Sequence, residues 1–171
     1  VFVASESVIK QMPAPLCIHV YRLVWRTLIL FGHNAIVPAI VLLWAHPDVT
    51  LVGLPIALVG MLLIVVNSVA LVLIFGTLGA RFRDLVPLLT NTTSLLFFAT
   101  PIFWRADQLG DRIWFAQINP IYHFIEVVRA PLLGQQVTTF TWVFVLVCTV
   151  LTVLAGFVVY SRFRVRIPYW I

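Results

Sequence analysis

The sequence predicts an all-α fold, a polytopic bundle of transmembrane helices. Of its 171 residues, 62% are hydrophobic and only 10% are charged, whereas a soluble domain carries roughly 25% charged residues. The mean hydropathy is +1.08. Such an apolar chain has to be solvated by lipid. Four apolar segments account for the excess and are predicted to cross the membrane: 27–45, 51–79, 85–104 and 138–160.

The N-terminal residues predict a short helix at the membrane surface. Ser5 is a suitable N-cap for a helix over residues 6–12, and Pro13 ends it. Glu6 and Lys10 stand four residues apart, a weakly favourable pair. The helix is either an interfacial connector or a docking element for a soluble partner. The chain has neither an initial methionine nor a signal peptide, and we expect membrane segments to precede it.

The first two spans contain isolated polar groups. Segment 27–45 has 19 residues without a formal charge, just enough to cross a core of roughly 30 Å at about 1.5 Å per residue. His33 and Asn34 lie inside it. Segment 51–79 exceeds one straight crossing, so it is expected to tilt or extend, and Asn67 lies at its middle. We expect these polar groups either to join helices or to line a transport path.

A charged turn follows the second span. Arg81, Arg83 and Asp84 place three charges within four residues, between two apolar segments. A charge at the bilayer centre costs on the order of 2.5 kcal/mol or more. The charged turn, residues 80–85, is therefore predicted to lie at a membrane face.

The last two spans differ in polarity. Segment 85–104 carries Asn91 near its start and ends in Trp104, which suits an interfacial aromatic belt. Segment 138–160 contains no charged residue. A stop-transfer cluster follows it at once: Arg162, Arg164 and Arg166.

The region between these two spans predicts an unusual element. Two apolar stretches flank Asn119 and Pro120, and neither is long enough to cross a bilayer. Residues 113–133 are therefore predicted to form a re-entrant hairpin of two short helices, with a surface hairpin as the alternative. Glu126 and Arg129 are three residues apart and are able to pair on one helix face.

The basic residues predict the orientation. Four crossings place eight of the eleven bases on one side and three on the other. Since cytoplasmic loops carry the excess of Lys and Arg, the charged turn and the C-terminus are predicted to be cytoplasmic, and the hairpin extracytoplasmic. The cytoplasmic set is Lys10, Arg22, Arg26, Arg81, Arg83, Arg162, Arg164 and Arg166.

Several functions are excluded by what the sequence lacks. No GxxxxGK[ST] motif is present, so this chain does not hydrolyse ATP through a P-loop. The bases are too scattered for a nucleic-acid groove, and no Cys/His spacing predicts a metal site. We therefore expect no cofactor, no metal and no enzymatic activity. An intramembrane transferase using Asp107, Asp111 or Glu126 and a scaffold without a transport role remain as alternatives from other classes.

The order of motifs resembles a known family. A span ending in GARFRDL, a span ending in TPIFW, the stretch INPIYHFIEVVRAPLLG and a final span resemble the membrane subunit of type-2 ABC exporters. Within that family the sequence is similar to permeases for O-antigen, capsule and teichoic-acid polysaccharides. Residues 5–20 resemble the cytoplasmic region that couples to the ATPase, with Glu6, Ile9, Lys10 and Pro13 as contact candidates.

The resemblance implies a homodimer that works with separate ATP-binding subunits, contacts membrane lipids and exports a lipid-linked glycan from the bacterial inner membrane. It also implies two further N-terminal spans. Arg81, Arg83 and Asp84 would form a cytoplasmic gate or anchor, and Asn119, Pro120, Glu126 and Arg129 belong to the hairpin. A type-2 exporter of drugs or small lipophilic molecules shares this layout and stays open. Candidates for the translocation path are His33, Asn34, Asn67, Asn91, Phe97, Phe98, Trp104 and Tyr122.

Overall fold

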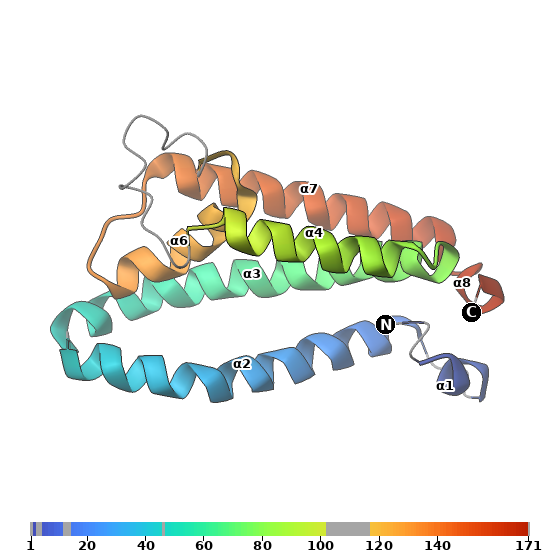
Figure 1. Cartoon of the computed structure of the whole chain (residues 1–171), viewed down its shortest axis with the longest axis horizontal. Helices are drawn as coiled ribbons and strands as arrows, with labels where there is room; N and C mark the ends of the chain where they lie inside the picture. Colours follow the sequence, from blue (N-terminus) through green and yellow to red (C-terminus); the bar gives the residue numbers. More distant parts are fainter. Residues whose placement is uncertain (1, 3–4, 12–14, 46, 102–116, 171) are drawn as a thin grey trace. The chain divides into compact units, whose positions relative to one another are not determined.

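The computed structural model describes residues 2, 5–11, 15–45, 47–101 and 117–170 (Figure 1). All regular structure in this part of the chain is helical. Among the described residues, three helices are long and apolar enough to cross a membrane. The prediction of an all-α polytopic membrane protein is thus confirmed. The helices are α1 (Glu6–Gln11), α2 (Cys17–Ala45), α3 (Pro47–Arg81), α4 (Leu85–Ala99), α6 (Pro120–Leu132), α7 (Thr139–Phe163) and α8 (Ile167–Trp170).

The long helices extend beyond the predicted spans. Segment 51–79 lies within the 35 residues of α3, and segment 138–160 lies almost wholly within α7. Helix α2 begins at Cys17, ten residues before the predicted span, and continues through Pro38. Proline is tolerated in membrane helices because neighbouring groups satisfy the freed carbonyl.

Helix α4 is shorter than the predicted segment 85–104. It has 15 residues and ends at Ala99, because Pro101 disfavours the helical conformation of Thr100. At about 1.5 Å per residue, 15 residues fall short of a core of roughly 30 Å. Residues 102–104 and the first part of the hairpin, 113–116, lie outside the described residues.

The chain divides into two compact units. The first comprises Val1–Val41, Leu63–Leu85 and Cys148–Ile171. Its core is formed by Phe2, Val20, Ala80 and Ile167, with Ile9 and Trp170 packed against it. The start of α2, the end of α3 and the C-terminal helix α8 therefore meet in this core.

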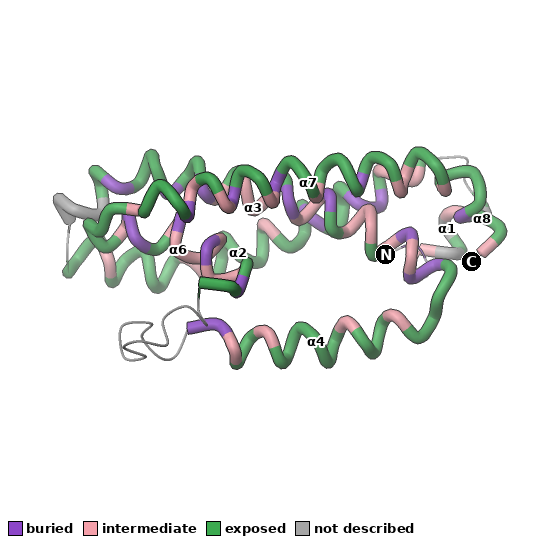
Figure 2. The backbone as a smooth tube through the Cα atoms, turned by 90° about the horizontal axis from the view of Figure 1, so that it is seen from above, coloured by how far each residue is buried: buried purple, intermediate pink, exposed green. Residues whose placement is uncertain are grey.

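The second unit comprises Leu42–Leu62 and Val86–Val147. It contains α4, α6, the first part of α3 and the start of α7. One face of α6 is buried through His123, Val127, Ala130 and Pro131, the spacing of an apolar stripe on a helix. Helix α4 buries none of its side chains, and Figure 2 shows it as exposed or intermediate along its length.

Candidate functional site

The Asn-Pro motif caps α6 and ties it to α4. Asn119 has an extended backbone, and its Oδ1 accepts a hydrogen bond from the Ile121 N–H at 3.0 Å. Pro120 follows at the first helical position, where its missing N–H costs nothing. The Asn119 Nδ2 donates to Thr100 Oγ1 at 2.8 Å, and that hydroxyl donates to the Leu96 carbonyl at 2.6 Å. Asn119 therefore fixes the start of α6 against the C-terminal end of α4.

His123 fastens α6 to the first turn of α7. Its side chain is 1% exposed. Nε2 lies 2.8 Å from the Gln117 carbonyl, which only accepts, so Nε2 carries the proton and donates. Nδ1 lies 3.1 Å from Thr141 Oγ1, and the ring contacts Phe144 at a centroid distance of 4.3 Å. The ring is thus held by polar contacts on both nitrogens and by an aromatic face.

Small residues let α6 approach the backbone of α3. A Cβ placed on Gly53 would lie 1.9 Å from the Pro131 carbonyl oxygen, and one on Gly60 would lie 3.0 Å from the Val127 carbonyl oxygen. Ala57, between them on the same face, is also buried. Small residues at such spacing allow membrane helices to pack at the level of their backbones.

The outer face of α6 carries its polar groups. Tyr122, Glu126 and Arg129 recur at helical spacing and are half-buried or exposed. Burial raises the pKa of the Tyr122 phenol; the charge of Glu126 raises this pKa further, and that of Arg129 lowers it. Glu126 and Arg129 do not form an ion pair within the described part of the chain, so the pairing that their spacing allows is not formed. The face presents a neutral phenol beside two opposite charges.

The charged turn contains one anchored arginine and one free one. The Arg81 guanidinium lies 5.2 Å from the ring centroid of Phe82 and 5.6 Å from that of Trp170. These are cation–π distances. Arg83 and Asp84 are exposed, and neither side chain has a hydrogen-bond or ion-pair partner among the described residues. Arg81 is therefore tied to the C-terminal helix, whereas the next two charges are available for other contacts.

Asn67 joins α3 to α7 within the first unit. Its Nδ2 donates to Thr149 Oγ1 at 2.6 Å, and its Oδ1 accepts from Thr152 Oγ1 at 2.6 Å. Gly156 adds a close approach, because a Cβ there would lie 3.1 Å from the Ala70 carbonyl oxygen. Of the two interpretations of Asn67, the structure shows the interhelical contact.

The other predicted path residues that the structure describes lie on α2, α4 and α6. His33 and Asn34 are exposed on α2. Asn91, Phe97 and Phe98 are exposed on α4, and the two phenyl rings meet edge to face at 5.6 Å. Trp104, Pro13, Asp107 and Asp111 lie outside the described residues, as do the side chains of Glu6 and Lys10.

Several site residues could not be singled out from the sequence. His123 follows Asn119 by four residues and belongs to the stripe with Val127 and Ala130, a pattern that marks the buried face of α6. The contact to Thr141 has no local signal. Trp170 was likewise not predicted to meet Arg81, which is far away in the chain. No three potential metal ligands gather among the described residues.

Comparisons with known proteins identify the family. Residues 1–133 match the family described as ABC-2 type transporter. The chain belongs to this family. The predicted resemblance to type-2 ABC exporter membrane subunits is thereby confirmed.

One curated relative is an O-antigen export system permease protein, RfbA, from Klebsiella pneumoniae. It is 27% identical over 117 residues, which cover 67% of this chain and 43% of the relative. The chain thus spans less than half the length of that relative. No solved structure matches the chain. This ABC-2 family chain is a multi-pass membrane protein.

Proposed function

We propose that this chain is the permease part of an ABC exporter that moves lipid-linked polysaccharide across the bacterial inner membrane. ATP hydrolysis takes place on a separate ATP-binding subunit. The family match over residues 1–133 carries the proposal of an ABC permease. The distant likeness to a permease named for O-antigen export favours a polysaccharide as the substrate.

A second copy of the chain is part of the proposal. Helix α2 buries only His19, Val20 and Val24 of its 29 residues, and α4 buries none. These apolar faces require lipid or protein around them. A translocation path between two copies would use the exposed aromatic side chains of α4, Phe97 and Phe98, because a ring face stacks on a sugar without holding it tightly.

The N-terminal region is proposed to transmit the ATPase motion. Ile9 of α1 packs against the core formed by Val20, Ala80 and Ile167. A displacement of α1 would therefore act directly on the ends of α2 and α3. This contact supports residues 5–20 as the coupling region.

The distribution of bases supports a cytoplasmic location for the charged segments of the first unit. All eight bases assigned to the cytoplasm fall within its three segments, while Arg105, Arg112 and Arg129 fall within the second unit. Under the positive-inside rule the C-terminus is cytoplasmic and the hairpin 113–133 extracytoplasmic. In that orientation Arg81 anchors the cytoplasmic end, and Arg83 and Asp84 are proposed to contribute to a gate.

Copurification and glycan export test the proposal. The gene product is expressed with a candidate ATP-binding chain, in cells that make a surface glycan. We expect the two chains to copurify and the glycan to reach the cell surface only when the P-loop lysine of the ATPase is intact.

Three results would contradict the proposal. Drug efflux without any change in surface glycan would show that the substrate is a drug and not a polysaccharide. Glycan transfer by the purified chain alone, lost on replacing Glu126, would indicate a transferase. Failure to copurify with any P-loop ATPase would favour the alternative that the chain is a membrane scaffold without a transport role.

A further inference from the structure

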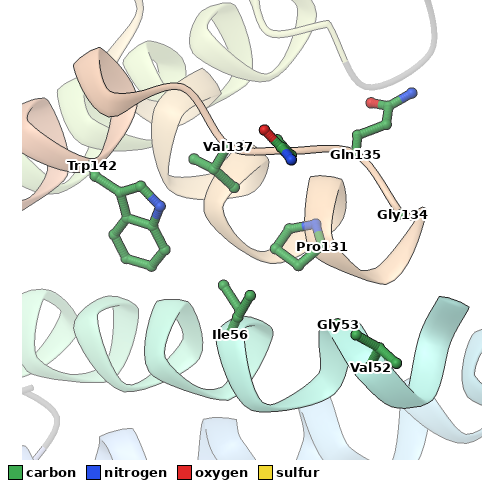
Figure 3. A pocket seen from close by; sticks show the side chains of 9 residues that line it. Val52, Gly53, Ile56, Pro131, Gly134, Gln135, Val137 and Trp142 are labelled. Atoms are coloured by element: carbon green, nitrogen blue, oxygen red, sulfur yellow. The ribbon is translucent and has the colours of Figure 1, made fainter.

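The second unit contains a pocket lined by none of the residues proposed for the transport path. It has a volume of about 640 Å³ and lies between α3, the end of α6 and the start of α7 (Figure 3). This volume falls within the range of small-ligand sites, roughly 300–1,000 Å³. The lining residues are Val52, Gly53, Ile56, Pro131, Gly134, Gln135, Gln136, Val137 and Trp142.

The pocket is formed by the way α6 ends. Gly134 has a φ of 72°, a conformation that glycine adopts readily. Its N–H donates to the Pro131 carbonyl at 3.2 Å, and the Gln135 N–H donates to the Ala130 carbonyl at 2.8 Å. This reversal is a Schellman-type cap. It turns the following residues back, so that Val137 and Pro131 both face α3 across the pocket (Figure 3).

The lining is uncharged and mainly apolar. Its aliphatic walls come from Val52, Ile56, Pro131 and Val137, and its polar side chains are two glutamines and the indole of Trp142. An anionic phosphate or carboxylate would enter without a cation to pair it, which is costly. A sugar ring would lose water from several hydroxyls and find few partners. A hydrocarbon chain fits these walls.

The pocket lies beside exposed apolar side chains at the start of α3. Val52 is 78% exposed and Ile56 is 47% exposed, and both lie at the start of the apolar stretch Leu51–Arg81 of α3. Trp142 lies in the first turn of the apolar helix α7. Tryptophan at the end of a span is typical of the membrane interface. In the orientation given under the proposed function, on which this step rests, the opening would face the outer part of the bilayer's hydrocarbon.

We propose that this pocket binds one acyl chain of a bilayer glycerophospholipid. The chain packs on Ile56, Val137 and Trp142, and its ester group lies near Gln135 and Gln136 at the rim. A neutral amide donates to an ester carbonyl, which suits a glycerophospholipid. In a polyprenyl phosphate the phosphate is bonded directly to the chain and would meet the uncharged rim. The lipid holds α3, α6 and the start of α7 in place, whatever cargo the exporter carries.

Lipid retention in native mass spectrometry tests the proposal. The purified gene product, with its ATPase partner, is exchanged into detergent with dioleoyl phosphatidylethanolamine as the probe. We expect one tightly held lipid per chain. Val52→Trp fills the mouth of the pocket and should reduce its occupancy about tenfold, the equivalent of losing the burial of roughly two methylene groups. Val137→Trp, from the opposite wall, should do the same.

Val59→Trp is the matched control. It changes the same residue type on α3, two turns away and also exposed, but Val59 does not line the pocket. Its lipid retention should equal that of the wild type. The proposal would be overturned if Val52→Trp and Val137→Trp both retained as much lipid as the wild type while circular dichroism showed both variants to be folded. Displacement of the lipid by equimolar polyprenyl phosphate would also overturn it, since the carrier chain would then be the occupant.

Discussion

Replacing Gly53 by alanine should separate α6 from α3. The new Cβ would lie 1.9 Å from the Pro131 carbonyl oxygen, whereas ordinary contact begins at 3.4 Å, so one backbone has to move by about 1.5 Å. No side-chain rotation relieves a clash with a carbonyl. Overpacking of this kind costs about 1–3 kcal/mol and occasionally more, and we expect a loss of on the order of 3 kcal/mol in the free energy of unfolding.

Two other glycines provide a graded comparison. A Cβ on Gly60 meets the Val127 carbonyl oxygen at 3.0 Å, and one on Gly79 meets nothing within 4 Å. Gly60→Ala should therefore cost about 1 kcal/mol, and Gly79→Ala should stabilise α3 by up to about 1 kcal/mol through helix propensity. Thermal unfolding of the three purified variants in the same detergent measures the order of their stabilities. A Gly53→Ala protein as stable as Gly79→Ala would refute the close approach.

Three further substitutions test separate contacts, each measured by thermal unfolding. Asn119→Ala should lower the free energy of unfolding by about 1–2 kcal/mol, because it removes both the cap of α6 and the bond to Thr100. Asn119→Asp keeps the cap and should recover part of this loss. Equal losses in both variants would argue against a capping role. Asn67→Leu should lower the free energy of unfolding by about 1 kcal/mol, because the interhelical hydrogen bonds are lost, including that to Thr149. An unchanged unfolding midpoint would show that these hydrogen bonds do not contribute to stability. The pKa of Tyr122 is raised above 10.0 in the folded chain. The phenol therefore ionises at lower pH in the unfolded chain, and the stability of the fold should fall as the pH rises past about 10. Tyr122→Phe should reduce this fall, and a pH profile identical to that of the wild type would contradict the assignment.

Hydropathy alone predicted the fold class. The long apolar helices α3 and α7 correspond to segments 51–79 and 138–160, because lipid solvation requires continuous apolar runs whose backbone is satisfied within the helix. The start of α2 was predicted less well. Arg22 and Arg26 end the apolar run but do not end the helix, since a helix continues through charged residues that lie outside the hydrocarbon. Composition locates the span, and backbone hydrogen bonding decides where the helix begins.

The site was predicted only in its local parts. The sequence singled out Asn119 and Pro120 as the break between two short apolar stretches, and the structure has the N-cap and the first residue of α6 at these positions. Their link to Thr100 and the bond from His123 to Thr141 join segments about twenty residues apart. Nothing in a local pattern specifies which hydroxyl a buried side chain will meet. The pocket beside Trp142 depends on the glycine turn after α6, so it too follows from tertiary structure.

The charged turn now separates into an anchor and a candidate gate. Arg81 is held over Trp170 and Phe82, a contact worth about 0.5–1 kcal/mol at an exposed site. Arg83 has no comparable contact among the described residues, so packing does not require its charge. If both arginines only set the depth of α3 at the membrane face, their replacement should leave export per inserted permease unchanged.

Arg83→Ala should therefore reduce export while leaving insertion, yield and the unfolding midpoint unchanged. Arg81→Ala, its matched control, should lower the unfolding midpoint because α8 loses its contact with the end of α3. Export is followed as surface glycan per inserted permease, and insertion by protease protection of the C-terminus. Normal export by Arg83→Ala would remove the gating role and leave the charged turn as an anchor alone. Reduced export together with normal insertion would support a role for Arg83 in the transport cycle, because the described residues offer no static contact whose loss could explain it.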